Sequence, residues 1–212
     1  LFRSFSEYRM LNLLDTSLNT DHNNELASGV RNSWRVSDNL NLNTSIEFLK
    51  VLSGSQQQAI ATAFGGDYRI SPESTISAKL EYRHLYDNAI VPGNQGQSQW
   101  LSSVSYARKV SQDWTLLTRN YFLLQQNNDN ASGVRIGNTF QDRAQIGFAW
   151  RPADNNLVNG LARYEYKTVR DHSQANGDDY NAHIVSGHLD FHPQRAWWMN
   201  TRVAAKLNTD RT

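Results

Sequence analysis

The sequence predicts an all-β protein, a single antiparallel sheet in which about eleven long strands follow one another up and down. Three observations lead to this prediction: long runs of side chains alternate between apolar and polar, a turn-like connector recurs, and the composition is unusual. Charged residues make up 19% of the chain and aromatic residues 11%, yet the mean hydropathy is −0.65. Few charges, many aromatic residues and a polar average suit a sheet with one apolar face and one wetted face.

A short connector recurs five times along the chain. Each copy begins with a basic residue or His and continues through Ser, Pro, Asp or Asn, which favour tight turns. The spacings are 35, 40, 41 and 41 residues between the markers Asp38, Glu73, Asp113, Asp154 and Arg195. Propeller blades and solenoid units can also repeat at this length, but two long strands with one tight turn and one longer loop match it better.

The runs between connectors alternate with period two, as strands do when their two faces meet different surroundings. In residues 78–83, Lys79, Glu81 and Arg83 alternate with apolar side chains, and residues 162–167 repeat the arrangement. The predicted strands are residues 1–10, 24–36, 40–51, 57–70, 75–86, 97–110, 114–126, 139–151, 157–170, 180–192 and 196–207. The alternate connectors, at 11–23, 87–96, 127–138 and 171–179, are longer and polar.

The length of these strands favours a membrane protein. Strands of twelve or more residues exceed the five or six typical of soluble proteins, and no window approaches the roughly 18 apolar residues of a membrane-spanning helix. We therefore predict an antiparallel up-and-down transmembrane β-barrel, with about eleven strands visible as part of a larger barrel. Residues 1–212 are expected to form one barrel segment, truncated at both ends. A soluble β-sandwich with aromatic residues at its ends is the alternative.

Aromatic side chains gather beside the short connectors and on the predicted apolar face. Amphipathic rings are favoured at the boundary between headgroups and acyl chains, so we expect a membrane girdle. Its predicted members are Trp34, Tyr68, Tyr82, Trp114, Trp150, Tyr164, Tyr166, Phe191 and Trp197, with Trp198 beside them.

Charged side chains fall by alternation on the other face, which in a barrel lines the lumen. The predicted lumen charges are Arg31, Arg35, Glu47, Asp67, Arg69, Lys79, Glu81, Arg83, Arg119, Arg143, Arg163, Glu165, Lys167, Arg202 and Lys206. Opposite charges on neighbouring strands can pair and stiffen the wall, and rings of charge also set ion preference in an open pore. Both interpretations stay open at this point.

Residues 31–40 (RNSWRVSDNL), 162–166 (ARYEY) and 195–199 (RAWWM) combine turn residues with girdle aromatics. They resemble the C-terminal barrel region of very large bacterial outer-membrane surface proteins that carry long arrays of extracellular-type repeats. The resemblance implies a barrel in the bacterial outer membrane, among its lipid and lipopolysaccharide, that anchors or translocates a surface protein or polymer. It supplies no catalytic or ligand-binding residues.

Eleven strands is an odd number, whereas single-chain bacterial barrels are usually even and closed. We expect the remaining strands to come from the same polypeptide or from further copies of the chain, because an open edge leaves backbone groups unbonded in lipid. A large lumen must hold water, a plug or a passenger chain. A general diffusion porin and a soluble β-rich binding protein are the alternative functions.

Little in the sequence indicates catalysis, a cofactor or nucleic-acid binding. The formal net charge is +1, cysteine is absent, and no nucleophile elbow, zinc-protease helix or phosphate-binding glycine loop is present. His188 and His192 share a strand face but lie about 13 Å apart, too far to ligate one metal ion. Acidic and amide residues at 127–130 and 178–179 match no calcium-loop spacing. We expect no enzyme activity, no cofactor and no metal.

Overall fold

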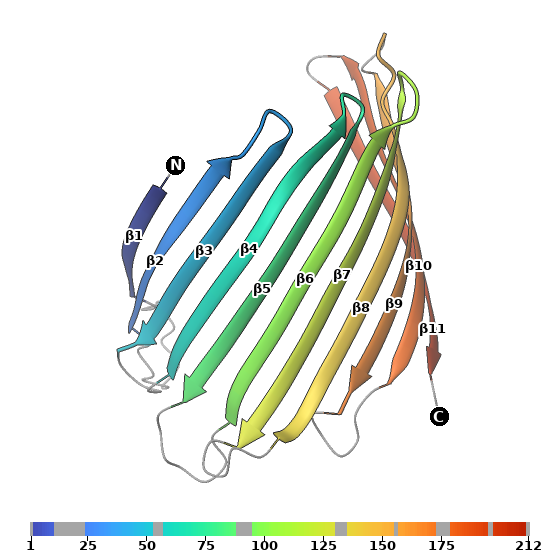
Figure 1. Cartoon of the computed structure of the whole chain (residues 1–212). Coiled ribbons are helices and arrows are strands. Elements are labelled where there is room, and N and C mark those ends of the chain that lie inside the picture. The colour runs from blue at the N-terminus through green and yellow to red at the C-terminus, as the bar shows by residue number, and fades with distance from the viewer. Residues whose placement is uncertain are drawn as a thin grey trace.

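The computed structural model describes residues 2–10, 24–52, 57–87, 95–129, 135–154, 157–172, 179–194 and 197–210. They form eleven antiparallel strands in one sheet, each paired with the next along the chain (Figure 1). The strands are β1 (Phe2–Met10), β2 (Asn24–Arg35), β3 (Leu40–Val51), β4 (Gln57–Ser71), β5 (Ser74–Asp87), β6 (Gln95–Lys109), β7 (Trp114–Asp129), β8 (Arg135–Trp150), β9 (Val158–Asp171), β10 (Tyr180–Gln194) and β11 (Trp197–Asp210).

The predicted number and up-and-down order of the strands are confirmed. The largest difference at a strand end is in β8, which begins at Arg135 and not at residue 139. Pairing between β7 and β8 continues past a register shift at Asn127 and Asn128, so both strands are longer than predicted. The polar composition of this stretch hid the extension, because it reads equally well as loop.

Serine side chains close the short turns at one end of the sheet. Ser37 Oγ accepts a hydrogen bond from the backbone N–H of Leu40 at 3.1 Å, and Ser111 Oγ accepts one from Trp114 at 3.2 Å. A Ser side chain that bonds the backbone in this way stabilises a turn. The connectors that contain Ser37 and Ser111 are therefore turns, as the sequence predicted.

Neighbouring turns are also bonded to one another. In four connectors the backbone N–H of the first residue donates to a carbonyl oxygen of the preceding turn, at 2.6–2.8 Å. The donor and acceptor pairs are Arg69 with Asn39, Lys109 with Glu73, Arg151 with Asp113, and His192 with Leu157. The sequence period near 40 residues thus corresponds to one hairpin placed beside the next.

The strand register assigns each strand residue to one of two faces, because paired residues share a face and successive residues alternate. Apart from the register shifts, odd-numbered residues of β1–β9 and even-numbered residues of β10 and β11 form the polar face. The remaining strand residues form the apolar face.

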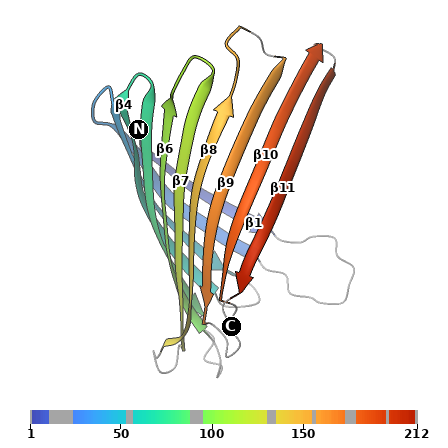
Figure 2. The same cartoon turned by 90° about the vertical axis from the view of Figure 1, so that its right-hand side faces the viewer.

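The sheet is strongly curved, with β1 and β11 at its margins (Figures 1 and 2). The polar face of β1–β5 surrounds a hollow of about 790 Å³, whose floor includes the small side chains Ala59, Ala61 and Ala63. In the described part of the chain the sheet does not close, since β1 and β11 each pair with one strand only.

The sheet has almost no apolar core. Among the described residues the buried apolar side chains are Ala27, Val169 and Ala182, and no large side chain is fully buried. Within the same ranges no second layer of sheet or helix covers either face. These residues also include no helix with the length and apolar character needed to cross a membrane.

Candidate functional site

The apolar face exposes large hydrophobic side chains on every strand. Examples, one from each strand in order, are Phe2, Val30, Ile46, Phe64, Leu80, Val104, Trp114, Phe148, Tyr164, Val185 and Val203. Soluble monomers rarely expose a continuous apolar patch larger than a few hundred Å². A surface of this kind, with exposed hydrophobic side chains on all eleven strands, is unfavourable in water.

All nine aromatic residues predicted as a girdle lie on the apolar face: Trp34, Tyr68, Tyr82, Trp114, Trp150, Tyr164, Tyr166, Phe191 and Trp197. Trp114 and Trp150 pair across β7 and β8, with ring centroids 6.3 Å apart. The grouping of Trp198 with them is corrected, because a residue that follows Trp197 directly must face the other way. Its ring stacks on His192 at 6.5 Å.

A second aromatic row crosses the apolar face farther from the short turns. It lies eight residues from the first row along β7, where Phe122 follows Trp114, and along β10, where His183 precedes Phe191. Its members are Phe48, Tyr82, Trp100, Phe122, Tyr166 and His183. The Tyr82 and Trp100 ring centroids are 4.7 Å apart, and those of Tyr166 and His183 are 5.1 Å apart. Only Tyr82 and Tyr166 of this row are among the predicted girdle residues, since recognising the row requires counting each strand from its turn.

The spacing of the two aromatic rows can be compared with the height of the apolar band in membrane barrels. Eight residues span about 26 Å along a strand, and a strand tilt of about 40° reduces this to about 20 Å of height. Membrane barrels carry an apolar band about 25 Å tall between two aromatic girdles. The separation of the two rows is therefore of the same order as the height of such a band.

The fifteen charges predicted to share a face do so, from Arg31 in β2 to Lys206 in β11. Three of them lie toward the turns. Arg35 Nη2 contacts Asp38 Oδ1 at 2.9 Å, Arg69 Nη2 donates to the Pro72 carbonyl oxygen at 3.5 Å, and Asp67 lies two residues before Arg69 on β4. The others occupy the middle of the sheet.

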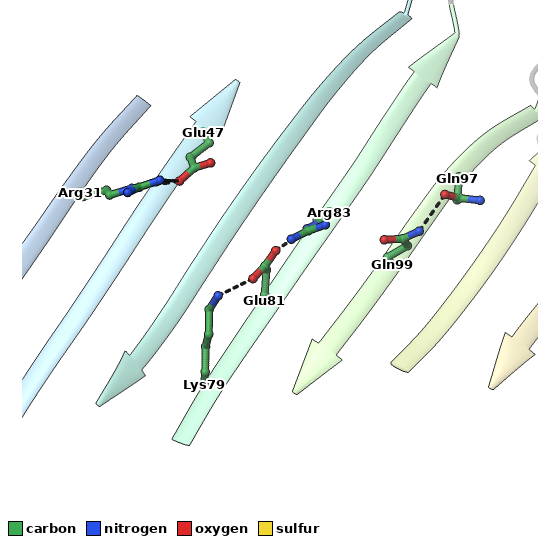
Figure 3. A network of polar contacts seen from close by, with 7 residues as sticks. All are labelled: Arg31, Glu47, Lys79, Glu81, Arg83, Gln97 and Gln99. Atoms are coloured by element: carbon green, nitrogen blue, oxygen red, sulfur yellow. Dashed lines mark hydrogen bonds and ion pairs between the residues drawn. The ribbon is translucent and has the colours of Figure 1, made fainter. Parts of the chain in front are cut away.

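A first cluster of charges lies over β2–β5 (Figure 3). Arg31 Nη2 pairs with Glu47 Oε1 at 2.7 Å. Lys79 Nζ contacts Glu81 Oε2 at 2.6 Å, and Arg83 Nε bonds the other oxygen of the same carboxylate. The Glu81 side chain is 10% exposed, against 53% for Lys79 and 54% for Arg83. The two cations therefore cover the carboxylate from both sides.

A second cluster lies over β8–β11. Gln145 Nε2 donates to Glu165 Oε2 at 2.7 Å, and Arg143 Nε is 3.9 Å from Glu165 Oε1. The Glu165 side chain is 8% exposed and that of Arg143 is 38% exposed. Lys167 Nζ donates to the Tyr180 hydroxyl at 2.9 Å, and Lys206 Nζ lies 5.3 Å from the centre of the same ring.

The other three predicted charges have no carboxylate partner among the described residues. Arg163 Nε donates to Ser186 Oγ at 3.3 Å. Arg119 is exposed and lies opposite Ser105 and Gln145. Arg202 is exposed and lies opposite His188.

A ladder of amides, not predicted from the sequence, lies on the polar face near the ends of β6 and β7. Gln99 Nε2 donates to Gln97 Oε1 at 2.8 Å, as Figure 3 shows, and to Gln125 Oε1 at 3.1 Å. Gln97 Nε2 in turn donates to Asn127 Oδ1 at 3.2 Å. The polar face is thus charged in the middle and neutral toward the longer connectors at this point. Alternation places these amides on the polar face, but only the register brings them together.

His188 does not meet a second histidine. Its Nε2 lies 3.1 Å from Asp190 Oδ2 and 3.2 Å from Asn200 Nδ2, and Asn200 also bonds Asp190. Within the ranges that the structure describes, no three His, Asp or Glu side chains are placed to hold one metal ion. The calcium candidates at 127–130 and 178–179 lie partly outside the described residues.

The chain matches no protein-family model and no curated protein. The structure defines its class as an all-β protein with one antiparallel, up-and-down sheet. One face of this sheet is apolar and the other is polar.

Proposed function

We propose that this sheet is part of a transmembrane β-barrel in the bacterial outer membrane that anchors or translocates a surface protein or polymer. The apolar face contacts lipid and lipopolysaccharide, and the polar face lines a wet lumen. The single observation that carries the proposal is the exposure of large hydrophobic side chains on one face of all eleven strands, with no covering layer in the described ranges.

The energetics support a membrane better than water. Burial of apolar surface is worth about 25 cal/mol per Å², so a whole face of Trp, Phe, Leu and Val left in water forfeits most of the energy that stabilises a domain of this size. Backbone groups are also satisfied by strand pairing, as crossing lipid requires, except at β1 and β11. Further strands must cover those two edges, and a lumen too large for side chains to fill holds water, alone or around a passenger or plug.

Two adjacent serines provide a direct test. Ser102 lies on the apolar face and Ser103 on the polar face, and the chain has no cysteine of its own. With the full-length protein in outer-membrane vesicles, a membrane-impermeant maleimide should label Ser103→Cys and spare Ser102→Cys. After denaturation both should react, which serves as the control. Equal labelling of both cysteines in the intact membrane, or recovery of the protein in a soluble fraction, would contradict the proposal.

A general diffusion porin is the second candidate, favoured by the open, charged hollow over β1–β5. The two candidates differ in what occupies the lumen. A photo-cross-linker attached at Ser103→Cys should capture another polypeptide or polymer in the anchoring and translocation version, and only the barrel itself in the porin version. Ion conductance without any captured chain would favour the porin.

A further inference from the structure

Basic groups outnumber acidic ones on the polar face. Of the fifteen predicted lumen charges, eleven are Lys or Arg and four are Asp or Glu. Alternation also predicts Arg3, Glu7 and Asp190 on this face, and the register adds Lys109 and Asp171. The described strand side chains of the polar face thus include thirteen basic and seven acidic groups. The chain as a whole is nearly balanced, with 21 basic and 20 acidic residues. The described strand side chains of the polar face therefore carry an excess of positive charge.

The carboxylates at the centre of the face are hidden, whereas the cations are not. Glu81 and Glu165 are almost completely covered, and the basic side chains around them remain about half exposed. In the pair between Arg31 and Glu47 the guanidinium is again the more exposed partner, at 62% against 39%. At these two clusters a solute consequently meets guanidinium and ammonium groups before it meets Glu81 or Glu165, whereas Glu7 and Asp67 are exposed elsewhere on the face.

Arg119 and Arg202 are among the exposed cations that no described carboxylate neutralises. Arg119 lines a hollow of about 230 Å³ together with Lys79 and the hydroxyl-bearing Ser77, Ser103 and Ser105. Guanidinium, ammonium and hydroxyl donors are the groups that bind carboxylate and phosphate oxygens. Asp67 also lines this hollow, and its carboxylate accepts a hydrogen bond from Ser77. Arg202 carries a second unneutralised charge on β11.

We infer that the polar face selects anionic solutes, such as carboxylate- or phosphate-bearing molecules, over cations. A charged wall backed by low-dielectric membrane focuses its field into the lumen and concentrates ions of opposite sign there. The inference rests on the proposed function, because it requires the polar face to line water inside a barrel.

Selectivity can be measured with the full-length protein in planar bilayers under a KCl gradient. The reversal potential should show a severalfold preference for chloride over potassium. The double substitution Arg119→Glu with Arg202→Glu should move the permeability ratio toward potassium, whereas Arg108→Gln on the apolar face of β6 should leave it unchanged. Cation preference in the unmodified protein, an unresponsive double variant, or absence of conductance would each overturn the inference.

A second measurement does not depend on conductance. Ser105 lies directly opposite Arg119, so Ser105→Cys places a thiol beside the unneutralised guanidinium. An anionic methanethiosulfonate should modify it severalfold faster than a cationic one, and Arg119→Gln should reduce that ratio. Because both reagents react with the same thiol, a change in the reactivity of that thiol cancels in the ratio of the two rates. A ratio of one or below would overturn the inference even if the labelling of Ser102→Cys and Ser103→Cys had supported the barrel, so the two failures are distinguishable.

Discussion

Residues 78–83 of β5 and 162–167 of β9 share a sequence pattern, but different groups bond the central carboxylate in each region. Each places a carboxylate between two cations on the polar face: Glu81 between Lys79 and Arg83, and Glu165 between Arg163 and Lys167. Glu81 is held by its own flanking cations, whereas Glu165 is held across the sheet by β8 and its flanking cations turn to β10.

The neighbouring strands explain the difference. Ala63 lies opposite Glu81 on β4 and cannot reach it, whereas Gln145 lies opposite Glu165 on β8 and donates a hydrogen bond. On the other side, Tyr180 and Ser186 of β10 accept from Lys167 and Arg163 and draw them away. The register partners, and not the local motif, decide which group neutralises a carboxylate.

The largest expected effect concerns a glycine that lies opposite the first cation of each region. Gly65 lies opposite Lys79 and Gly147 opposite Arg163, and a Cβ on either glycine would stand 2.9 Å from a backbone carbonyl oxygen. Gly65→Ala and Gly147→Ala should each lower the free energy of unfolding by about 1–3 kcal/mol. Urea unfolding in lipid vesicles, followed by Trp fluorescence, measures this. Gly187→Ala, where nothing lies within 4 Å, is the matched control; equal stability of all three variants would show that the sheet relaxes freely.

Removal of the carboxylate charge should lower the free energy of unfolding by different amounts in the two regions. Glu81→Gln leaves Lys79 and Arg83 without a counter-charge, and should cost about 1–2 kcal/mol because both cations are half exposed to water. Glu165→Gln keeps an oxygen that accepts from Gln145, so the expected loss is below about 1 kcal/mol. The same unfolding assay ranks the two. A larger loss at Glu165 would mean that Arg143, at 3.9 Å, contributes more than its distance suggests.

An amide introduced on β4 should bond Glu81 in the way that Gln145 of β8 bonds Glu165. In a Lys79→Met background, Ala63→Gln introduces on β4 the amide that β8 provides at Gln145. It should recover about 0.5 kcal/mol by bonding Glu81, and a double-mutant cycle with Glu81→Met, which has no acceptor oxygen, isolates that interaction. No coupling between positions 63 and 81 would show that the curvature over the hollow keeps the amide out of reach.

The smallest expected effect is at Tyr180. Tyr180→Phe removes the hydroxyl that accepts from Lys167 but keeps the ring that both Lys167 and Lys206 approach at 5.3 Å. The loss should be about 0.5 kcal/mol or less, and Tyr180→Leu, which also removes the ring, should lose more. Identical stability of the Phe and Leu variants would rule out a contribution from the ring.

Alternation in the sequence was sufficient to predict the strands and to sort their side chains. Lys79, Glu81 and Arg83 share a face because successive strand residues point to opposite sides, and this requires no knowledge of neighbours. Contacts between strands could not be predicted in the same way. The bond from Gln145 to Glu165, the amide ladder at Gln97 and the second aromatic row all depend on register, which turns and bulges set.

Trp198 and β8 show two other limits of the sequence. Composition alone groups Trp198 with Trp197, although one step along a strand reverses the face. The polar residues at the start of β8 are as compatible with a loop as with a strand, so only the pairing with β7 shows that they belong to the strand.

The uniform antiparallel pairing of the sheet has a consequence for how it can be sealed. Every step from one strand to the next reverses chain polarity, so β1 and β11 run in the same direction. A direct seam between them would be parallel, and so would every seam between copies of this sheet inserted with the same orientation. An entirely antiparallel cylinder requires an odd number of additional strands between β11 and β1, which identical copies joined edge to edge do not supply.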